Sequence, residues 1–167
     1  MKRALVSLVV LALLGWVQAG FAEEQKIGYI NLKTLLDDYK KVTDGEDQLL
    51  NQAEEKNEER DNMVKNIKNL REQIDLLNEA DKEKKQQELD EKIKALQEFT
   101  YQTRTSLRQD RDEKFRDIMK EVKTVIEEYG KSHNYNIIID DTLLLYKQEN
   151  LDVTEEIVKI LNQRYKK

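Results

Sequence analysis

Two series of heptad-spaced positions mirror each other about one point in the middle of the chain. The first runs through Leu49, Ala53, Lys56, Arg60, Met63, Ile67, Leu70, Ile74 and Leu77, and the second runs through Leu89, Ile93, Leu96, Thr100, Thr103 and Leu107. Folding the chain at that point sets Ile74 opposite Leu89, and the later positions pair in the same register. Two independent helices have no reason to agree in this way, so the sequence predicts an antiparallel coiled-coil hairpin over 46–129.

The seam of this hairpin changes character along its length. It is polar at several early positions but apolar throughout Met63–Leu77, so we expect the arm to pack best at its far end. The Asn and Asp in 78–81 predict the hairpin tip. Beyond Leu107 the seam moves to Arg111, Phe115, Ile118, Val122, Val125 and Tyr129. Two consecutive four-residue steps form a stutter there, which predicts a splay or bend.

The arm is too long for a compact domain. Each helix of about 32 residues spans roughly 50 Å at 1.5 Å per residue. Gly130 follows the last seam position and is expected to end the second helix. Charged residues make up 38% of the chain and Pro is absent, which is typical of either long solvated helices or disorder. The periodic apolar residues favour the helices.

Strand-like sequence flanks the arm on both sides. The segments 26–31, 135–140 and 143–146 are rich in β-branched and aromatic residues, with a tight turn expected at 140–142 and a last helix over 153–165. Together 23–45 and 130–167 form a small body, giving an α+β, mostly α fold with the arm inserted in it. One chain buries little apolar surface there, so self-association is expected. The candidate oligomerisation residues are Ile27, Tyr29, Ile30, Ile137, Ile138, Ile139, Leu143 and Leu145.

The first 22 residues have the layout of a secretory signal peptide. Lys2 and Arg3 precede the apolar stretch 4–14, and small residues follow, with cleavage expected after Ala22 or, alternatively, Ala19. An uncleaved anchor is the competing interpretation. No later segment reaches the roughly 20 apolar residues of a membrane span, so we expect an exported chain with no integral membrane segment once processed.

The exported chain is acidic and lacks cysteine, so it can form no disulfide. Removing the signal leaves 27 basic against 34 acidic residues, a net charge of −7. This balance offers no nucleic-acid footprint. His133 has no companion ligands, and the adjacent Asp140 and Asp141 are typical of a turn. Phosphate loops and nucleophile elbows are absent from the sequence, so we expect no enzyme and no cofactor or metal.

Seven arm residues are candidates for contact with other polypeptides. Lys65, Lys68 and Arg71 form an acid-free run that fits either a solvated face or a weak patch for anionic headgroups or acidic segments. Met63, Phe99, Tyr101 and Leu107 fit either the helix seam or soft contacts with a client. Phe99 and Tyr101 lie off the strict seam and are therefore the better client-binding candidates.

The order of these features resembles the Skp/OmpH family of periplasmic chaperones. Lys26–Asn31 is similar to the family's opening strand, Tyr135–Asp140 to its strand after the hairpin, and Leu151–Thr154 to the start of its last helix. The resemblance implies a periplasmic homotrimer shaped like a jellyfish, whose three arms enclose a cavity. Unfolded outer-membrane proteins are held in that cavity without ATP, as a holdase does.

The chain departs from that family in its charge. The best-known members are strongly basic, whereas this chain is acidic, so the resemblance carries over no lipopolysaccharide-binding residues. A second function remains open on the sequence alone: a structural or adaptor protein of the cell envelope, in which the coiled coil spaces or docks one defined partner.

Overall fold

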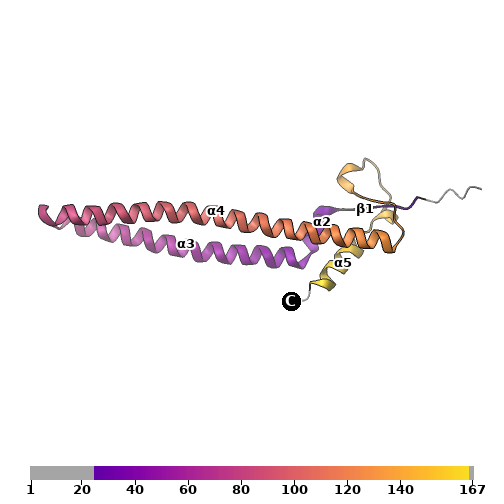
Figure 1. Ribbon diagram of the computed structural model, residues 1–167, viewed down its shortest axis with the longest axis horizontal. Coiled ribbons are helices and arrows are strands. Elements are labelled where there is room, and N and C mark those ends of the chain that lie inside the picture. Colours follow the sequence, from indigo (N-terminus) through magenta and orange to yellow (C-terminus); the bar gives the residue numbers. More distant parts are fainter. Residues whose placement is uncertain (1–24, 166–167) are drawn as a thin grey trace, which may run out of the picture.

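A long two-helix arm projects from a small body (Figure 1). The computed structural model describes residues 25–165. The elements in chain order are β1 (Ile27–Ile30), α2 (Leu32–Asp38), α3 (Lys40–Asp75), α4 (Glu79–Ser132), β2 (Ile137–Asp140), the 3₁₀ turns η1 (Asp141–Leu143) and η2 (Glu149–Leu151), and α5 (Thr154–Arg164). The mostly helical, α+β architecture expected from the sequence is confirmed.

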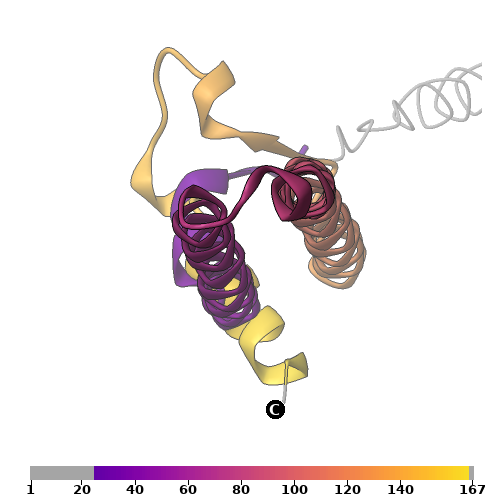
Figure 2. The same cartoon turned by 90° about the vertical axis from the view of Figure 1, so that its left-hand side faces the viewer.

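Helices α3 and α4 form the antiparallel arm that the mirrored heptads predict. They run side by side from the body to the tip (Figures 1 and 2). The turn occupies 76–78 rather than the predicted 78–81. Asn78 causes the difference, because its side chain accepts a hydrogen bond from the Asp81 amide at 3.1 Å and thereby caps the start of α4.

The far half of the arm has a closed apolar seam. Ile67, Leu70, Ile74 and Leu89 are buried in one cluster, and Ile93 and Leu96 pack against it. These are the residues that the mirrored series placed opposite one another, so the predicted register is confirmed at this end of the arm.

The middle of the arm is packed differently. Among the described residues, none is buried between 40 and 66 of α3 or between 90 and 117 of α4. Phe115, which the shifted seam placed in the core, is 54% exposed. That prediction was wrong because the stutter rotates the inward face of α4, and burial resumes only at Ile118.

The body core is built from α2, the root of α4, and α5. Its most deeply buried side chains are Leu35, Tyr39, Val122, Ile157 and Leu161. Helix α5 follows the sequence prediction to within one residue at each end. Asp152 accepts a hydrogen bond from the Thr154 amide at 2.8 Å and so supports the first turn of α5.

The sheet of the body has two parallel strands. Ile27 pairs with Ile137 and Ile30 with Asp140, and on its other side β1 makes a single bridge from Tyr29 to Asp152. The strand expected at 143–146 was wrong. Asp140 accepts hydrogen bonds from the amide and hydroxyl of Thr142, which winds 141–143 into η1 instead.

Helix α4 also continues past Gly130, contrary to expectation, and ends at Ser132. Asn134 takes the left-handed conformation with φ 58°, and the Tyr135 amide donates to the Gly130 carbonyl at 2.9 Å. This is the hydrogen bond of a Schellman cap, with Asn in place of Gly. A Cβ at Gly130 would meet Ile138 Cδ1 at 3.5 Å, which is an ordinary van der Waals contact.

Candidate functional site

The arm joins the body at a single-residue break, Tyr39, between α2 and α3. Tyr39 has an extended ψ of 109°, which interrupts the helical hydrogen bonds. Asn162 of α5 bridges the break: its amide nitrogen donates to the Asp38 carbonyl at 3.0 Å, and its oxygen accepts from the Lys40 amide at 2.9 Å. Because one side chain holds both sides of the break, α5 sets the direction in which the arm leaves the body.

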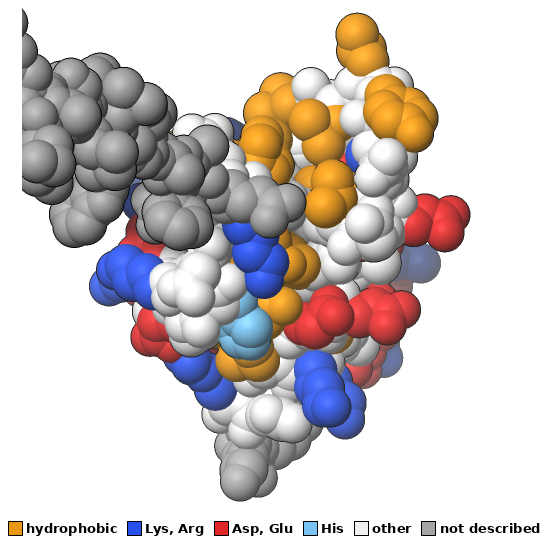
Figure 3. Space-filling view, turned by 90° about the vertical axis from the view of Figure 1, so that its right-hand side faces the viewer, with side chains coloured by type: hydrophobic (Ala, Val, Ile, Leu, Met, Phe, Trp, Pro, Cys, Tyr) orange, Lys and Arg blue, Asp and Glu red, His pale blue; other side chains and the backbone are white. Residues whose placement is uncertain are grey.

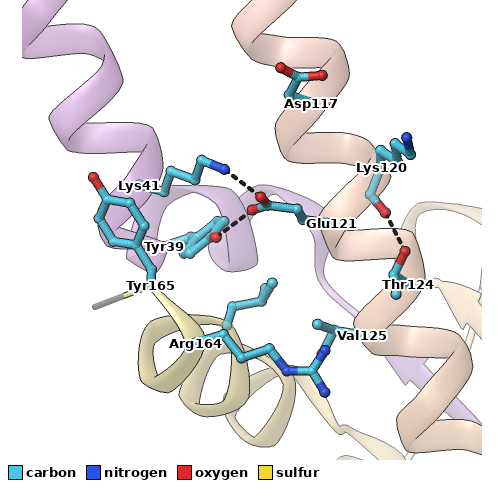
Figure 4. Close-up of a pocket in the computed structure, with 10 residues that line it drawn as sticks. Tyr39, Lys41, Asp117, Lys120, Glu121, Thr124, Val125, Arg164 and Tyr165 are labelled. Carbon is cyan, nitrogen blue, oxygen red and sulfur yellow. Dashed lines mark hydrogen bonds and ion pairs between the residues drawn. The ribbon is translucent and has the colours of Figure 1, made fainter. Parts of the chain in front are cut away.

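A cavity of about 460 Å³ lies beside this joint, between α3, α4 and α5 (Figure 4). The Tyr39 hydroxyl donates to Glu121 at 2.8 Å, and Lys41 forms an ion pair with the same carboxylate. Burial and the bond to Glu121 raise the pKa of Tyr39 well above its ordinary value. Partial burial opposes ionisation of Glu121, but the bonds from Lys41 and Tyr39 prevail and lower its pKa. The hydrogen bond and the ion pair leave each of these polar groups with a partner and link the start of α3 to α4. We refer to Tyr39, Lys41 and Glu121 as the polar lock.

The end of the body opposite the arm carries exposed apolar side chains (Figure 3). These are Ile27, Ile137, Leu143, Leu145 and Tyr146, which come from the sheet and from the loop after β2. A monomeric protein rarely gathers so many large apolar side chains on one surface. We refer to these five residues as the body face.

The loop that presents the body face is held in place. Lys147 binds Asp141 at 2.5 Å and lies 4.6 Å from the centre of the Tyr29 ring, and Asn31 donates to Asp141 at 2.8 Å. The bond from Lys147 is the main cause that lowers the pKa of Asp141. The loop is therefore fixed by polar contacts on its inner side while its apolar side chains point outward.

The candidate oligomerisation residues divide by burial within one chain. Ile27, Ile137, Leu143 and Leu145 are exposed, and Ile138 and Ile139 are half-buried. Tyr29 and Ile30 are buried and belong to the core of the single chain. Leu143 and Leu145 were proposed as strand residues; they lie instead in η1 and the following loop.

The client-binding candidates also fall into two groups. Tyr101 is 73% exposed, and Lys65, Lys68 and Arg71 are exposed, with Lys68 4.0 Å from Glu72. Met63, Phe99 and Leu107 are half-buried. Phe99 lies under the Lys56 ammonium, which is 5.4 Å from the ring centre, and with Leu107 it lines a groove of about 230 Å³ between the helices.

Sequence reasoning missed the exposed apolar residues Leu50, Val64, Phe115 and Tyr146. Leu50 and Val64 each follow a seam position directly. That single-residue offset was the available signal, because a residue next to the seam on a two-helix arm has no third helix to cover it.

Nothing in the described part of the chain assembles a metal site. Residues 25–165 contain no cluster of three or more His, Cys, Asp or Glu side chains that could hold a metal ion. His133 stacks on Tyr129 with ring centres 4.0 Å apart, at the end of α4. Within residues 25–165, no helix is both long and apolar enough to cross a membrane.

Comparison with known proteins assigns the family. The sequence profile of the OmpH-like outer membrane protein family matches residues 26–161, which include both the body and the arm. The chain belongs to the OmpH-like family. No curated protein sequence matches it.

One solved structure illustrates how far this fold is shared. It is a protein from Caulobacter crescentus assigned as a candidate outer membrane chaperone (OmpH-like). The TM-score is 0.77 at 13% sequence identity, over 84% of this chain and 85% of the other. At that identity the likeness establishes a common fold for the two OmpH-like chains.

Proposed function

We propose that this OmpH-like protein is an ATP-independent periplasmic holdase chaperone. It would bind unfolded outer-membrane proteins between the helical arms of a homotrimer and keep them from aggregating. The observation that carries the proposal is the arm itself, which projects far from the body and leaves apolar side chains exposed along its middle. Such a surface suits many weak contacts with non-native chains better than one shaped site.

The body face supports the assembly part of the proposal. Its five apolar side chains lie beside β2, whose outer edge has no partner strand within the described part of the chain. Burying this face against further copies removes that surface from water and stabilises a small body. Membership of the OmpH-like family favours three copies, in line with the resemblance noted from the sequence.

The proposed location is the periplasm, reached by export and removal of residues 1–22. Those residues lie outside the part of the chain that the structure describes. The name of the Caulobacter relative, an outer membrane chaperone candidate, fits this location. We propose Tyr101, Lys65, Lys68 and Arg71 as client contacts, since all four are exposed, with Met63, Phe99 and Leu107 contributing where the groove opens.

Light scattering of the processed protein, with and without an unfolded outer-membrane barrel, tests the function. We expect a trimer that takes up one client in a soluble complex. A monomer or dimer that leaves the client to aggregate would contradict the proposal. Specific capture of one folded partner would favour the adaptor instead.

The body face has its own test. Leu145→Asp places a charge in the proposed interface and should shift the mass toward the monomer. Lys159→Asp, on the exposed side of α5, is the matched control and should leave the mass unchanged. Equal masses for the two variants would show that the body face is not part of the interface between copies.

A further inference from the structure

The middle of the arm has charged residues at positions where a coiled coil normally has apolar ones. Lys56 and Arg60 occupy consecutive seam positions of α3, and the mirrored register sets Leu107 and Thr103 opposite them on α4. Seam positions are apolar in a stable coiled coil, and a cation there lowers its stability. Neither Leu107 nor Thr103 can neutralise a cation. The two basic residues therefore weaken the seam without forming an ion pair across it.

The groove of about 230 Å³ between the helices lies at this level of the arm. Its lining combines three cations with apolar and hydroxyl groups, and none of the described side chains that line it is a carboxylate. The chain as a whole has a net charge of −5, so this local excess of positive charge runs against its composition. We refer to the groove lined by Lys56, Arg60, Phe99, Thr103, Arg104 and Leu107 as the cationic groove.

The cations of this groove are only partly neutralised by the rest of the chain. Lys56 lies 2.9 Å from Glu59, and Arg60 lies 2.7 Å from Asp61, in exposed pairs along α3 itself. Arg104 forms no ion pair with any residue in the described part of the chain. Because exposed pairs contribute little free energy, they exchange readily with other anions. The groove can therefore bind carboxylates from outside the chain.

The cationic groove also offers an apolar contact of limited size. Phe99 and Leu107 are half-buried, and the Lys56 ammonium lies 5.4 Å from the centre of the Phe99 ring. Sites that enclose a drug-sized ligand have volumes of roughly 300–1,000 Å³, so this groove is smaller. It has room for one or two side chains of a longer occupant and not for the long acyl chains of a lipid. Its dimensions therefore favour a polypeptide.

We propose that the cationic groove binds acidic segments of unfolded polypeptides, a proposal that rests on the holdase function and names the kind of client segment taken. Carboxylates of the segment bind Arg60 and Arg104, whose planar guanidinium groups match a carboxylate in shape and charge. An aromatic or aliphatic side chain of the same segment contacts Phe99 and Leu107. Each arm carries its own groove, so the arms stay apart and Tyr101 remains available to the client.

Two fluorescent peptides of equal length test the binding. One alternates Asp and Ser around a central Phe, and the other has Lys in place of each Asp. Fluorescence anisotropy should show that the processed protein binds the acidic peptide several-fold more tightly. Arg60→Gln with Arg104→Gln should abolish this preference, whereas Lys94→Gln with Arg116→Gln, an equal change of charge at exposed sites outside the groove, should preserve it. Equal losses in the two double variants would overturn the proposal.

Cysteine protection locates the bound peptide, because the chain contains no cysteine. Thr103→Cys places a thiol in the groove, and Ser106→Cys places one at an exposed site of α4 outside it. Saturating acidic peptide should slow the reaction of Thr103→Cys with a maleimide several-fold and leave the reaction of Ser106→Cys unchanged. Equal rates for Thr103→Cys with and without the peptide would show that the groove is not the binding site.

The stability of one variant separates a binding role for Arg60 from a structural one. Arg60→Leu replaces a cation by an apolar residue at a seam position, so it should raise the midpoint of thermal unfolding. The same change should weaken binding of the acidic peptide several-fold. A lower midpoint would mean that Arg60 stabilises the arm, and would contradict its assignment as a binding group.

Three outcomes separate this site from the proposed function and from a lipid site. A trimer that holds an unfolded barrel without preferring the acidic peptide would refute the cationic groove and leave the holdase function intact. A protein that binds neither the barrel nor the peptides would refute both. If Arg60→Gln with Arg104→Gln weakened binding to phosphatidylglycerol vesicles but not to the acidic peptide, the groove would be a site for anionic lipid instead.

Discussion

The two halves of the arm use the same two helices in different ways. Toward the tip, Ile67, Leu70, Ile74 and Leu89 close the seam. In the middle no described residue is buried, and a groove lined by Lys56, Arg60 and Arg104 separates the helices. The arm is therefore fastened at its tip and at the body, while the region between them keeps side chains available to other chains.

The largest effect should come from the body, where the arm is anchored. Ile157 is fully buried among α2, α4 and α5. Ile157→Ala removes that packing and should cost about 4 kcal/mol in the free energy of unfolding, measured with denaturant. Val158→Ala, at a half-buried neighbour, should cost clearly less. Equal losses would mean that the body core does not depend on this face of α5.

The next effect separates the two halves of the arm. Ile67→Asp places a charge in the closed seam and should destabilise the far half by about 3 kcal/mol. Hydrogen exchange should quicken near the tip, while the mass of the assembly stays unchanged. Val64→Asp, at an exposed site of the same helix, is the control. Loss of the assembly by Ile67→Asp would show that arm and body are not separate units.

The joint should respond more weakly. Asn162→Ala leaves the Asp38 carbonyl and the Lys40 amide without their bridge, which should cost about 1–2 kcal/mol. Small-angle scattering should record a wider range of arm orientations. Gln163→Ala, an exposed neighbour in α5, should leave the scattering curve unchanged. Identical scattering curves for the two variants would show that Asn162 does not restrict the orientation of the arm.

A gain of stability is expected at the root of α3. Gly45 lies within the helix, and a Cβ added there would meet no atom within 4 Å. Gly45→Ala should therefore stabilise the chain by about 0.5–1 kcal/mol in thermal unfolding. Gly28→Ala is the opposite case, since its Cβ would lie 2.8 Å from the Tyr135 ring. A loss of stability at Gly45 would mean that the root needs a flexible residue.

The smallest effect concerns pH at the polar lock. The folded chain lowers the pKa of Glu121 below its ordinary 4.5, so the lock stabilises the fold above that pH. This contribution should be lost as the pH falls from about 4.5 through the lowered pKa. Glu121→Gln should flatten that part of the stability profile. Parallel profiles for the wild type and Glu121→Gln would contradict this assignment.

The sequence predicted the arm well and its surroundings less well, for physical reasons. Heptad spacing is a local property, so the seam from Ile67 to Leu96 and its register followed from residue types alone. The prediction of a strand at 143–146 was wrong because the Asp140 side chain accepts hydrogen bonds from Thr142 and so stabilises a turn. The β-propensity of individual residues does not show whether such a side-chain hydrogen bond or a strand is the more stable.

The joint and the exposed position of Phe115 could not be predicted from the sequence for another reason. Asn162 contacts Asp38, which lies 124 residues earlier in the sequence, and no local sequence pattern predicts such a contact. Phe115 fitted a seam by spacing, yet the stutter turned it toward solvent.

The parallel pairing of β1 with β2 constrains how the chain can fold. The two strands lie 110 residues apart in sequence, and contacts that distant are slow to form in a flexible chain. The hairpin removes most of that separation. If α3 and α4 pair from the tip toward the body, the start of α3 and the end of α4 come together next to the two strands. Once the arm has formed, β1 and β2 are joined by a much shorter effective loop, which lowers the entropy cost of pairing them. Damage to the tip should delay closure of the sheet even where the finished body is unaffected.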